Sequence, residues 1–463
     1  MRIDAKFFKT KALFPIDEFV ALVLTLCLMA LVVLIWAVRL PWTWGRVVRP
    51  EKVLLFSYEG HKVAPTRVRC YHFAEVLRRQ GVDAEVFAYW DEYARLAHFP
   101  FPFRRIWEVE KFCINLATLI QLLPKGPMVI MEQRPNYDFI VPLSLKLLNG
   151  SRVVMDIDDW TLSYRAFVAF YRFEVRHMLP FFALYCDTCI VSSRCLQERL
   201  SRHFEHVPLL PTYVDHERFV PAPDSDSQSS GGPVVFSWVG TIFQDFTYDN
   251  VMFMVEAFKR ACDMLGTREG LALDIVGGGD YFEKVRAQVR DHYDGYSVNV
   301  TPWLAPEKMP AYLQSIDVGL YCLVAPSLFH ESKSPTKIFE YYACAKPVVS
   351  TRVGEAKYFV RPGETGYLAA DVQEFAQGMV HMMEDAGKRQ AMGLEGRRLA
   401  EAEWNMDAAC RTLSGILLHE PSPRSQADFE SRRLRNEAKS QSSPGRFSPE
   451  ASPHAVPNAT KEN

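Results

Sequence analysis

The chain has 463 residues, which is enough for two domains of ordinary size and excludes a single small module. Its 53 lysines and arginines nearly balance 55 acidic residues, and the formal net charge of -2 gives no general attraction to nucleic acid. We therefore expect no nucleic-acid partner. The 10 cysteines lack the spacing of a disulfide framework, which indicates reduced thiols and a reducing compartment.

An uncharged apolar run of 20 residues extends from Phe19 to Val38. As a helix it would be about 30 Å long, which matches a bilayer core and exceeds the apolar part of a signal peptide. The sequence predicts an N-terminal flank at 1–18, a single-pass transmembrane anchor at 19–38, and a cytoplasmic catalytic part. Charge leaves the orientation open, because basic residues flank the run on both sides: Arg2, Lys6, Lys9 and Lys11, then Arg39, Arg46 and Arg49.

Residues 51–220 alternate short apolar runs with helical segments, a pattern typical of a parallel sheet covered by helices. We expect a helix at 71–80 and strands at 53–57, 84–88, 128–131, 153–156 and 188–192. Ligands bind at the carboxyl ends of such strands. Charged residues follow two of them and are the predicted acceptor-side residues: Arg67, Arg69, Asp156, Asp158 and Asp159.

The three aspartates lie within four residues and repel one another. They could form a solvated strand end, bind a cation, or hold the hydroxyls of a sugar. The arginines could hold an anionic group such as a lipid phosphate. This domain is therefore the predicted acceptor side.

A Pro/Ser/Gly segment at 221–233 predicts a linker, and a second α/β domain is expected at 234–405. Its predicted elements are a helix at 250–265 and strands at 234–240, 271–280, 298–300, 317–323 and 347–351. A long helix with Trp404 near its middle should end at about His419, with 406–419 as a C-terminal helix and 420–463 as a disordered tail. The fold class is α/β, with two Rossmann-like domains facing a cleft.

The most informative stretch is SPTKIFEYYACAKPVV, from Ser334 to Val349. Ser334 could cap a helix that starts with Pro335, which places Lys337 in the first turn. A cation there is unfavourable beside the positive helix end unless an anion binds, which indicates a phosphate. Glu340 shares the helix face with Lys337, so one nucleotide could contact both, although an ordinary surface pair would look the same.

Several motifs, in this order and spacing, make the chain resemble the two-domain retaining glycosyltransferases of the glycogen-synthase and family-4 type (GT-B). They are PTYVD at 211–215, VGT at 239–241, IVGGGD at 275–280, Trp303, DVGLYCL at 317–323, the Ser334 stretch, and GETGYLA at 363–369. The resemblance covers roughly 53–419. It implies that the second domain binds a nucleotide sugar.

The resemblance also implies roles for individual residues. Lys337 would hold the donor phosphates and Glu340 the ribose, and the predicted catalytic residues are Lys337, Glu331 and Ser334. The remaining predicted donor-binding residues are Gly240, Thr241, Gly277, Gly278, Trp303, Thr336 and Ile338. This chain departs from the family pattern at Ser332, where an acidic residue is common, and in TIFQDFTYDN at 241–250, where an Arg/Lys pair is common.

The resemblance implies sugar transfer from a nucleotide sugar to a glycan or lipid-linked acceptor, with retention, without a metal, and with no cofactor. Two alternatives stay open. The D-x-D element at Asp156 and Asp158 resembles the metal site of single-domain, metal-dependent glycosyltransferases. A catalytically silent, membrane-tethered scaffold could also retain the nucleotide-sugar fold.

Overall fold

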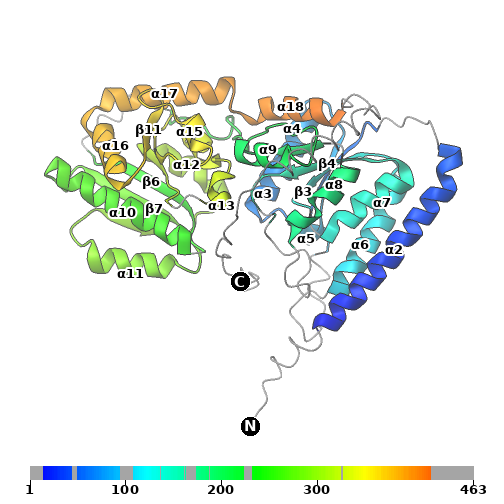
Figure 1. The fold of residues 1–463 in the computed structure, drawn as a ribbon. Helices are drawn as coiled ribbons and strands as arrows, with labels where there is room; N and C mark the ends of the chain where they lie inside the picture. Colours follow the sequence, from blue (N-terminus) through cyan, green and yellow to red (C-terminus); the bar gives the residue numbers. More distant parts are fainter. Residues whose placement is uncertain are drawn as a thin grey trace, which may run out of the picture. The chain divides into compact units, whose positions relative to one another are not determined.

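The computed structural model describes residues 14–418 apart from 44–49, 94–107, 136, 161, 163–173, 187, 224–231, 244 and 325–326. The predicted flank at 1–18, most of the predicted linker and the predicted tail therefore lie largely outside the described residues. The described part contains two parallel sheets and the helices that cover them (Figure 1).

The first sheet has five parallel strands in the order β2-β1-β3-β4-β5. Val53 of β1 lies opposite Ala84 of β2 and Val129 of β3. Nearly all strand residues are buried because helices cover both faces, which explains their continuous apolar runs. The strands are β1 (Val53–Ser57), β2 (Ala84–Ala88), β3 (Val129–Gln133), β4 (Arg152–Ile157) and β5 (Thr188–Val191).

The second sheet has six parallel strands in the order β11-β10-β9-β6-β7-β8. The strand order reverses between β9 and β6, which in such sheets opens a ligand-binding crevice at the carboxyl ends. The predicted fold class, two Rossmann-like α/β domains, is confirmed. The strands are β6 (Val234–Thr241), β7 (Leu271–Gly278), β8 (Val298–Thr301), β9 (Val318–Tyr321), β10 (Val348–Thr351) and β11 (Gly366–Ala369).

The helices of the first domain differ from prediction after β1. The expected helix at 71–80 begins earlier, because α3 (Ala64–Thr66) continues through a π-helical turn at Arg67–His72 into α4 (Phe73–Arg79). Such turns are frequent at functional sites. The other helices of this domain are α5 (Tyr89–Glu92), α6 (Glu108–Leu122), α7 (Ile140–Asn149), α8 (Leu179–Tyr185) and α9 (Arg194–Leu200).

The second domain carries α10 (Asp245–Leu265), α11 (Phe282–His292), α12 (Met309–Ser315), α13 (Leu328–Glu331), α14 (Thr336–Ala343), α15 (Ala356–Phe359), α16 (Val372–Glu384) and α17 (Ala386–Ala402). The predicted long helix around Trp404 is wrong. Helix α17 ends at Ala402, and α18 (Met406–Leu418) starts after Asn405, whose side chain accepts a hydrogen bond from Ala408 N (2.8 Å). Trp404 lies between the helices, with its ring packed against Phe359.

Helix α18 returns to the first domain. Met406, Cys410 and Leu413 are buried in the same apolar core as Val53 and Met131 of the first sheet. The chain therefore passes from one sheet to the other through residues 192–233 and returns through the turn at Trp404. In the described part of the chain, the short helix α18 is the last element after the chain has returned to the first domain.

Helix α2 (Phe14–Thr43) contains the apolar run predicted to cross a membrane. Phe19–Pro41 is long and apolar enough for a span, with a mean hydropathy of 3.0. The helix does not stand apart from the first domain, because it lies beside α6 and α7 (Figure 1).

Candidate active site

Helix α14 begins one residue later than the sequence predicted. Pro335 occupies the N-cap position, and no side chain caps the helix. Ser334 lies one residue too early to cap, and its Oγ instead accepts a hydrogen bond from Thr212 N (2.9 Å) in the segment that joins the domains. The predicted cap at Ser334 is therefore wrong, and its predicted catalytic role stays a prediction.

Lys337 and Glu340 are half-buried on one face of α14, as their spacing predicted. Burial and the nearby charge of Lys333 lower the pKa of Lys337 to about 8, although Glu340 opposes the shift. Burial raises the pKa of Glu340 to about 7, against the attraction of Lys337, Arg218 and Arg67. Both groups therefore titrate near neutral pH, which is typical of functional sites.

These pKa values predict a bell-shaped pH dependence of donor affinity for the free protein, with a maximum between about 7 and 8. Below this range Glu340 gains a proton and accepts hydrogen bonds from ribose less well; above it Lys337 loses its charge and its attraction to phosphate. Donor titrations from pH 6 to 9 measure the profile. Lys337→Arg should remove the alkaline limb and Glu340→Gln the acidic limb. A flat profile for the unmodified protein would contradict both assignments.

Two arginines that lie outside the second sheet, Arg67 and Arg218, attract the carboxylate of Glu340 and oppose the rise of its pKa. Arg67 belongs to the π-helical turn, and burial and Arg218 lower its pKa while Glu307 and Glu340 oppose the shift. Arg218 donates to Pro306 O (2.9 Å), in the turn that follows Trp303. Arg218 was not among the predicted site residues, although it lies only three positions after the PTYVD motif at 211–215. These cations gather at the residue predicted to hold ribose.

Lys333 and Trp238 are two further residues that sequence reasoning missed. Lys337 Nζ lies 5.7 Å from the centre of the Trp238 ring. Lys333 Nζ lies 4.5 Å from the centre of the Phe329 ring. Lys333 supplies a second cation to a site that has no lysine or arginine in the 241–250 segment. The K-S-P-T-K spacing of the two lysines was the available signal.

The glycines at the ends of β6 and β7 allow close backbone contact. A Cβ on Gly277 would lie 2.0 Å from Gly240 O, and a Cβ on Gly240 would lie 2.5 Å from the Trp238 ring. A Cβ on Gly278 would meet only Trp303 Cβ, at 3.6 Å. Thr241 is exposed at the end of β6. At the carboxyl edge of the sheet, backbone groups of the glycines therefore lie beside the side chain of Trp303.

Trp303 follows β8 and is 50% exposed. An exposed indole beside a glycine edge can stack on a nucleotide base, as the resemblance implied. Trp303→Ala should weaken nucleoside diphosphate binding about tenfold, the order expected for one base stacked on an aromatic ring. Calorimetric titration of the variant measures the loss. Trp90→Ala, which alters a partly exposed tryptophan of the first domain, is the matched control; equal effects of both variants would contradict base stacking.

The remaining donor-site residues differ in their access. Thr336 is half-buried at the start of α14, whereas Ile338 is fully buried in the core. Only the backbone of Ile338 can therefore face a ligand.

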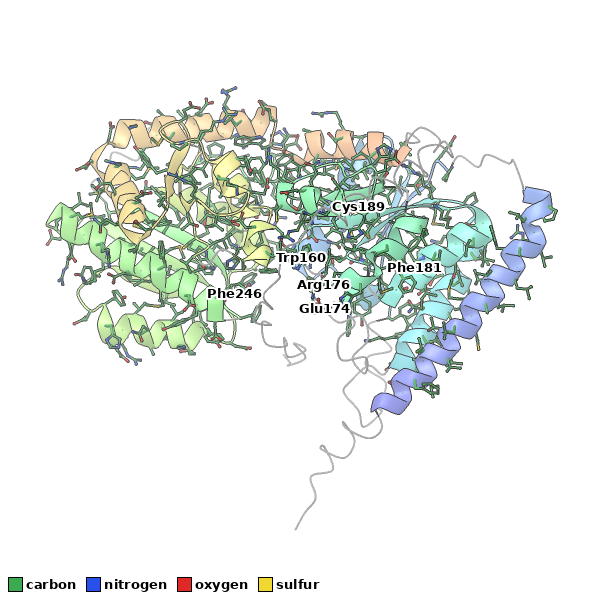
Figure 2. All side chains as sticks on the ribbon, viewed as in Figure 1. Trp160, Glu174, Arg176, Phe181, Cys189 and Phe246 are labelled. Atoms are coloured by element: carbon green, nitrogen blue, oxygen red, sulfur yellow. The ribbon has the colours of Figure 1, made fainter. Side chains whose placement is uncertain are left out.

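Glu331 and Ser332 lie before α14 and make contacts within the protein. Glu331 Oε2 accepts from Gly354 N (3.2 Å) and pairs with Lys357 Nζ (3.3 Å). Ser332 is fully buried, and its Oγ accepts from Trp160 N (3.0 Å) of the first domain. These contacts support the backbone, and the predicted catalytic role of Glu331 stays a prediction. Figure 2 shows Trp160 at the border between the two domains.

The predicted acceptor-side residues divide into two groups. Arg69 and Asp156 are fully buried and form a bidentate ion pair. Arg69 also donates to Leu210 O (3.0 Å) and Thr212 Oγ1 (3.2 Å). The predicted direct binding of an acceptor by this pair does not fit its burial. Arg69 instead holds the segment whose Thr212 N also bonds to Ser334.

Asp158 and Asp159 share Arg134, which sequence reasoning missed. Arg134 Nη2 donates to Asp158 Oδ2 and Asp159 Oδ2, both at 3.0 Å, and Arg134 Nη1 lies 3.5 Å from Glu59 Oε2. Its backbone has a φ of 52°, a conformation that non-glycine residues rarely adopt and that often marks functional sites. The side chains of Asp159 and Glu59 remain 23% and 37% exposed, whereas that of Asp158 is only 7% exposed. Asp159 and Glu59 therefore remain accessible at the edge of the first sheet, while Asp158 is buried against Arg134.

The sequence of this chain is similar to those of known glycosyltransferases. Residues 233–385 match the family described as Glycosyl transferases group 1. A GDP-mannose-dependent alpha-(1-6)-phosphatidylinositol monomannoside mannosyltransferase of Mycolicibacterium smegmatis is 28% identical over 217 residues, which are 45% of this chain and 55% of that protein. The Mycobacterium tuberculosis protein of the same name is 25% identical over 216 residues. The chain spans about half the length of the curated relatives it matches.

Solved structures match over more of the chain. Anabaena HepE in complex with UDP-glucose has 16% identity and a TM-score of 0.58, covering 79% of this chain and 99% of that one. Sucrose-phosphate synthase from Thermosynechococcus elongatus has 17% identity and the same TM-score, covering 79% and 98%. At this identity the similarity establishes the fold. The chain therefore has the GT-B fold of two-domain glycosyltransferases and carries a glycosyl transferases group 1 domain at residues 233–385.

Proposed function

We propose that the protein transfers a sugar from a nucleoside diphosphate sugar to a glycan or lipid-linked acceptor, with retention and without a metal ion. The observation that carries this proposal is the half-buried pair of Lys337 and Glu340 on α14, with Lys333 and Arg218 near it and Trp303 exposed beside the glycine edge. Phosphate, ribose and base each meet a suitable group in this arrangement.

The relatives and structural neighbours support the donor class. The mycobacterial relatives are named as GDP-mannose-dependent, and HepE was solved with UDP-glucose. The named acceptor of the relatives is a phosphatidylinositol mannoside, which supports a lipid-linked acceptor for this chain. On the acceptor side, we propose that Asp159 holds a sugar hydroxyl, with the buried Asp158 orienting the shared Arg134, and that Arg67 meets an anionic group.

The proposed reaction breaks the bond between the sugar's anomeric carbon and the β-phosphate oxygen. Negative charge grows on the departing diphosphate, and the ammonium of Lys337 and the amides at the start of α14 stabilise it more in the transition state than in the ground state. Glu340 orients the nucleotide through the ribose. The acceptor oxygen bonds to the anomeric carbon, and its proton passes to the departing diphosphate, which leaves carrying it.

Metal independence is proposed from the carboxylates of the first domain. Arg69 is paired with Asp156, and Arg134 is paired with Asp158 and Asp159. These guanidinium groups therefore already contact the carboxylates that a metal ion would need as ligands. A metal site at the D-x-D element would require these ion pairs to break.

A donor screen on the detergent-solubilised full chain tests the proposal. Nucleoside diphosphate release is measured with GDP-mannose, UDP-glucose and related donors, with and without acceptor lipids. Release with at least one donor, unchanged by EDTA, is the expected result, and the product should keep the donor's anomeric configuration. Binding without turnover of any donor would favour the silent scaffold, loss of turnover in EDTA would contradict metal independence, and an inverted product would contradict retention.

A further inference from the structure

The apolar helix α2 is docked on the first domain along one narrow stripe. Ala21, Thr25 and Val32 are buried at positions i, i+4 and i+11, which fall on one side of a helix. Met29 lies on the same side, and its Sδ is 3.9 Å from Ser144 Oγ of α7. Val32 belongs to the same apolar core as residues of α6 and α7. The contact is therefore an ordinary packed interface.

Both ends of α2 are bonded to this same domain. Asp17 Oδ1 accepts from Val109 N (3.3 Å) at the start of α6. Arg39 Nη1 donates to Leu148 O (2.6 Å) near the end of α7. Arg39 follows Asp17 by 22 positions along the helix, a rise of about 33 Å, which is close to the hydrocarbon thickness of a bilayer.

A docked α2 cannot cross a bilayer without taking part of the domain with it. A crossing would place Val109 and Leu148 near opposite membrane faces and would bring α6 and α7 into the hydrocarbon. These helices share an apolar core with Leu54 of β1 and Ile130 of β3, so a crossing would also draw the sheet and its polar loops toward the hydrocarbon, where charged groups are costly. The docked arrangement and a crossing therefore exclude each other.

The part of the α2 surface that does not contact the domain is nevertheless apolar and exposed. No charged residue occurs from Phe19 to Val38. Phe19, Leu26 and Leu34 are each about 60% exposed, and only 17% of the most apolar window is buried. An apolar surface of this length on a soluble protein would aggregate or bind a membrane. It has no polar face that could lie against water.

The flanking charges agree with both ends lying on one side of the membrane. Four basic residues precede the run within the first 11 residues, and three follow it within the next 11. Positive flanks favour the cytoplasmic side, so two positive flanks disfavour a crossing between them. We propose that α2 lies within one leaflet of the bilayer, docked on α6 and α7, with both of its ends on the same membrane face. The first domain then rests on the lipid surface, and the single crossing predicted from length and hydropathy is replaced by monotopic attachment.

A topology measurement on the full chain tests this directly. One epitope tag is placed before Met1 and another after Asn463, and sealed membrane vesicles of both orientations are probed with antibody and protease. Accessibility of both tags on the same face is the expected result. Accessibility of the tags on opposite faces would overturn the proposal.

A disulfide test asks whether α2 remains docked in the membrane. In a Cys27→Ser and Cys113→Ser background, which removes the exposed native thiols of α2 and α6, Met29→Cys with Ser144→Cys should cross-link in intact membranes. Leu26→Cys with Ser144→Cys is the matched control, because Leu26 is exposed on the other side of α2, and it should stay reduced. Failure of the Met29 pair, or equal cross-linking of both pairs, would overturn the docked arrangement.

Discussion

Replacing Lys337 by alanine should lower the turnover number about 10²- to 10³-fold, the range seen when one preorganised group that stabilises an oxyanion is removed. Burial and Lys333 already lower the pKa of Lys337 to about 8, so its charge is held in the site at an energetic cost that a bound diphosphate would offset. The loss should fall more on kcat than on KM, because charge on the leaving diphosphate develops in the transition state. Steady-state kinetics with the donor identified by the screen measure both constants.

Two variants control this measurement. Lys259→Ala removes an exposed lysine that pairs with Asp263 on α10 and should leave both constants unchanged. Lys337→Arg keeps the charge in a different shape and should fall between alanine and the unmodified protein. A Lys337→Ala protein with near-normal kcat would remove Lys337 from the proposed mechanism.

Replacing Arg69 by alanine should lower the free energy of unfolding of the first domain by about 3–5 kcal/mol, because it leaves a buried carboxylate without its partner. Asp156 is fully buried, and the change also removes the bonds to Leu210 O and Thr212 Oγ1. Thermal unfolding followed by circular dichroism and limited proteolysis of the solubilised protein measures the loss.

The double variant Arg69→Met with Asp156→Leu separates the charge from the packing. It should recover most of the stability, since apolar residues of similar volume can replace a buried ion pair. Arg290→Ala, which removes an exposed partner of Asp291, should leave stability unchanged. An Arg69→Ala protein that unfolds normally but no longer binds acceptor would instead restore the direct acceptor role predicted from sequence.

Much of the fold could be predicted because the information is local. Strands buried on both faces leave continuous apolar runs, and β1 and β2 were located at their observed bounds. The break at Trp404 was missed because Asn405 caps α18 within a sequence that otherwise favours one continuous helix. The packing of α2 against the first domain could not be predicted from the sequence, because the side of α2 that contacts the domain is as apolar as the side that is exposed.

The candidate site divides in the same way. Lys337 and Glu340 could be found because a three-residue spacing on a helix fixes their relation. Arg134, Arg218 and Trp238 were missed because their roles depend on contacts between residues far apart in the chain. Arg69 and Asp156 illustrate the converse, because two conspicuous charged residues proved to neutralise each other across 87 positions.

Helix α18 has a consequence for the order of folding. It is the last described element of the chain, yet it supplies Met406, Cys410 and Leu413 to the core around β1, the first strand. During synthesis the first domain therefore emerges with part of its apolar core uncovered, and it remains so until about 200 further residues have been made. A fragment that stops at the end of the first domain should consequently need chaperones or a separately supplied α18 peptide to stay soluble.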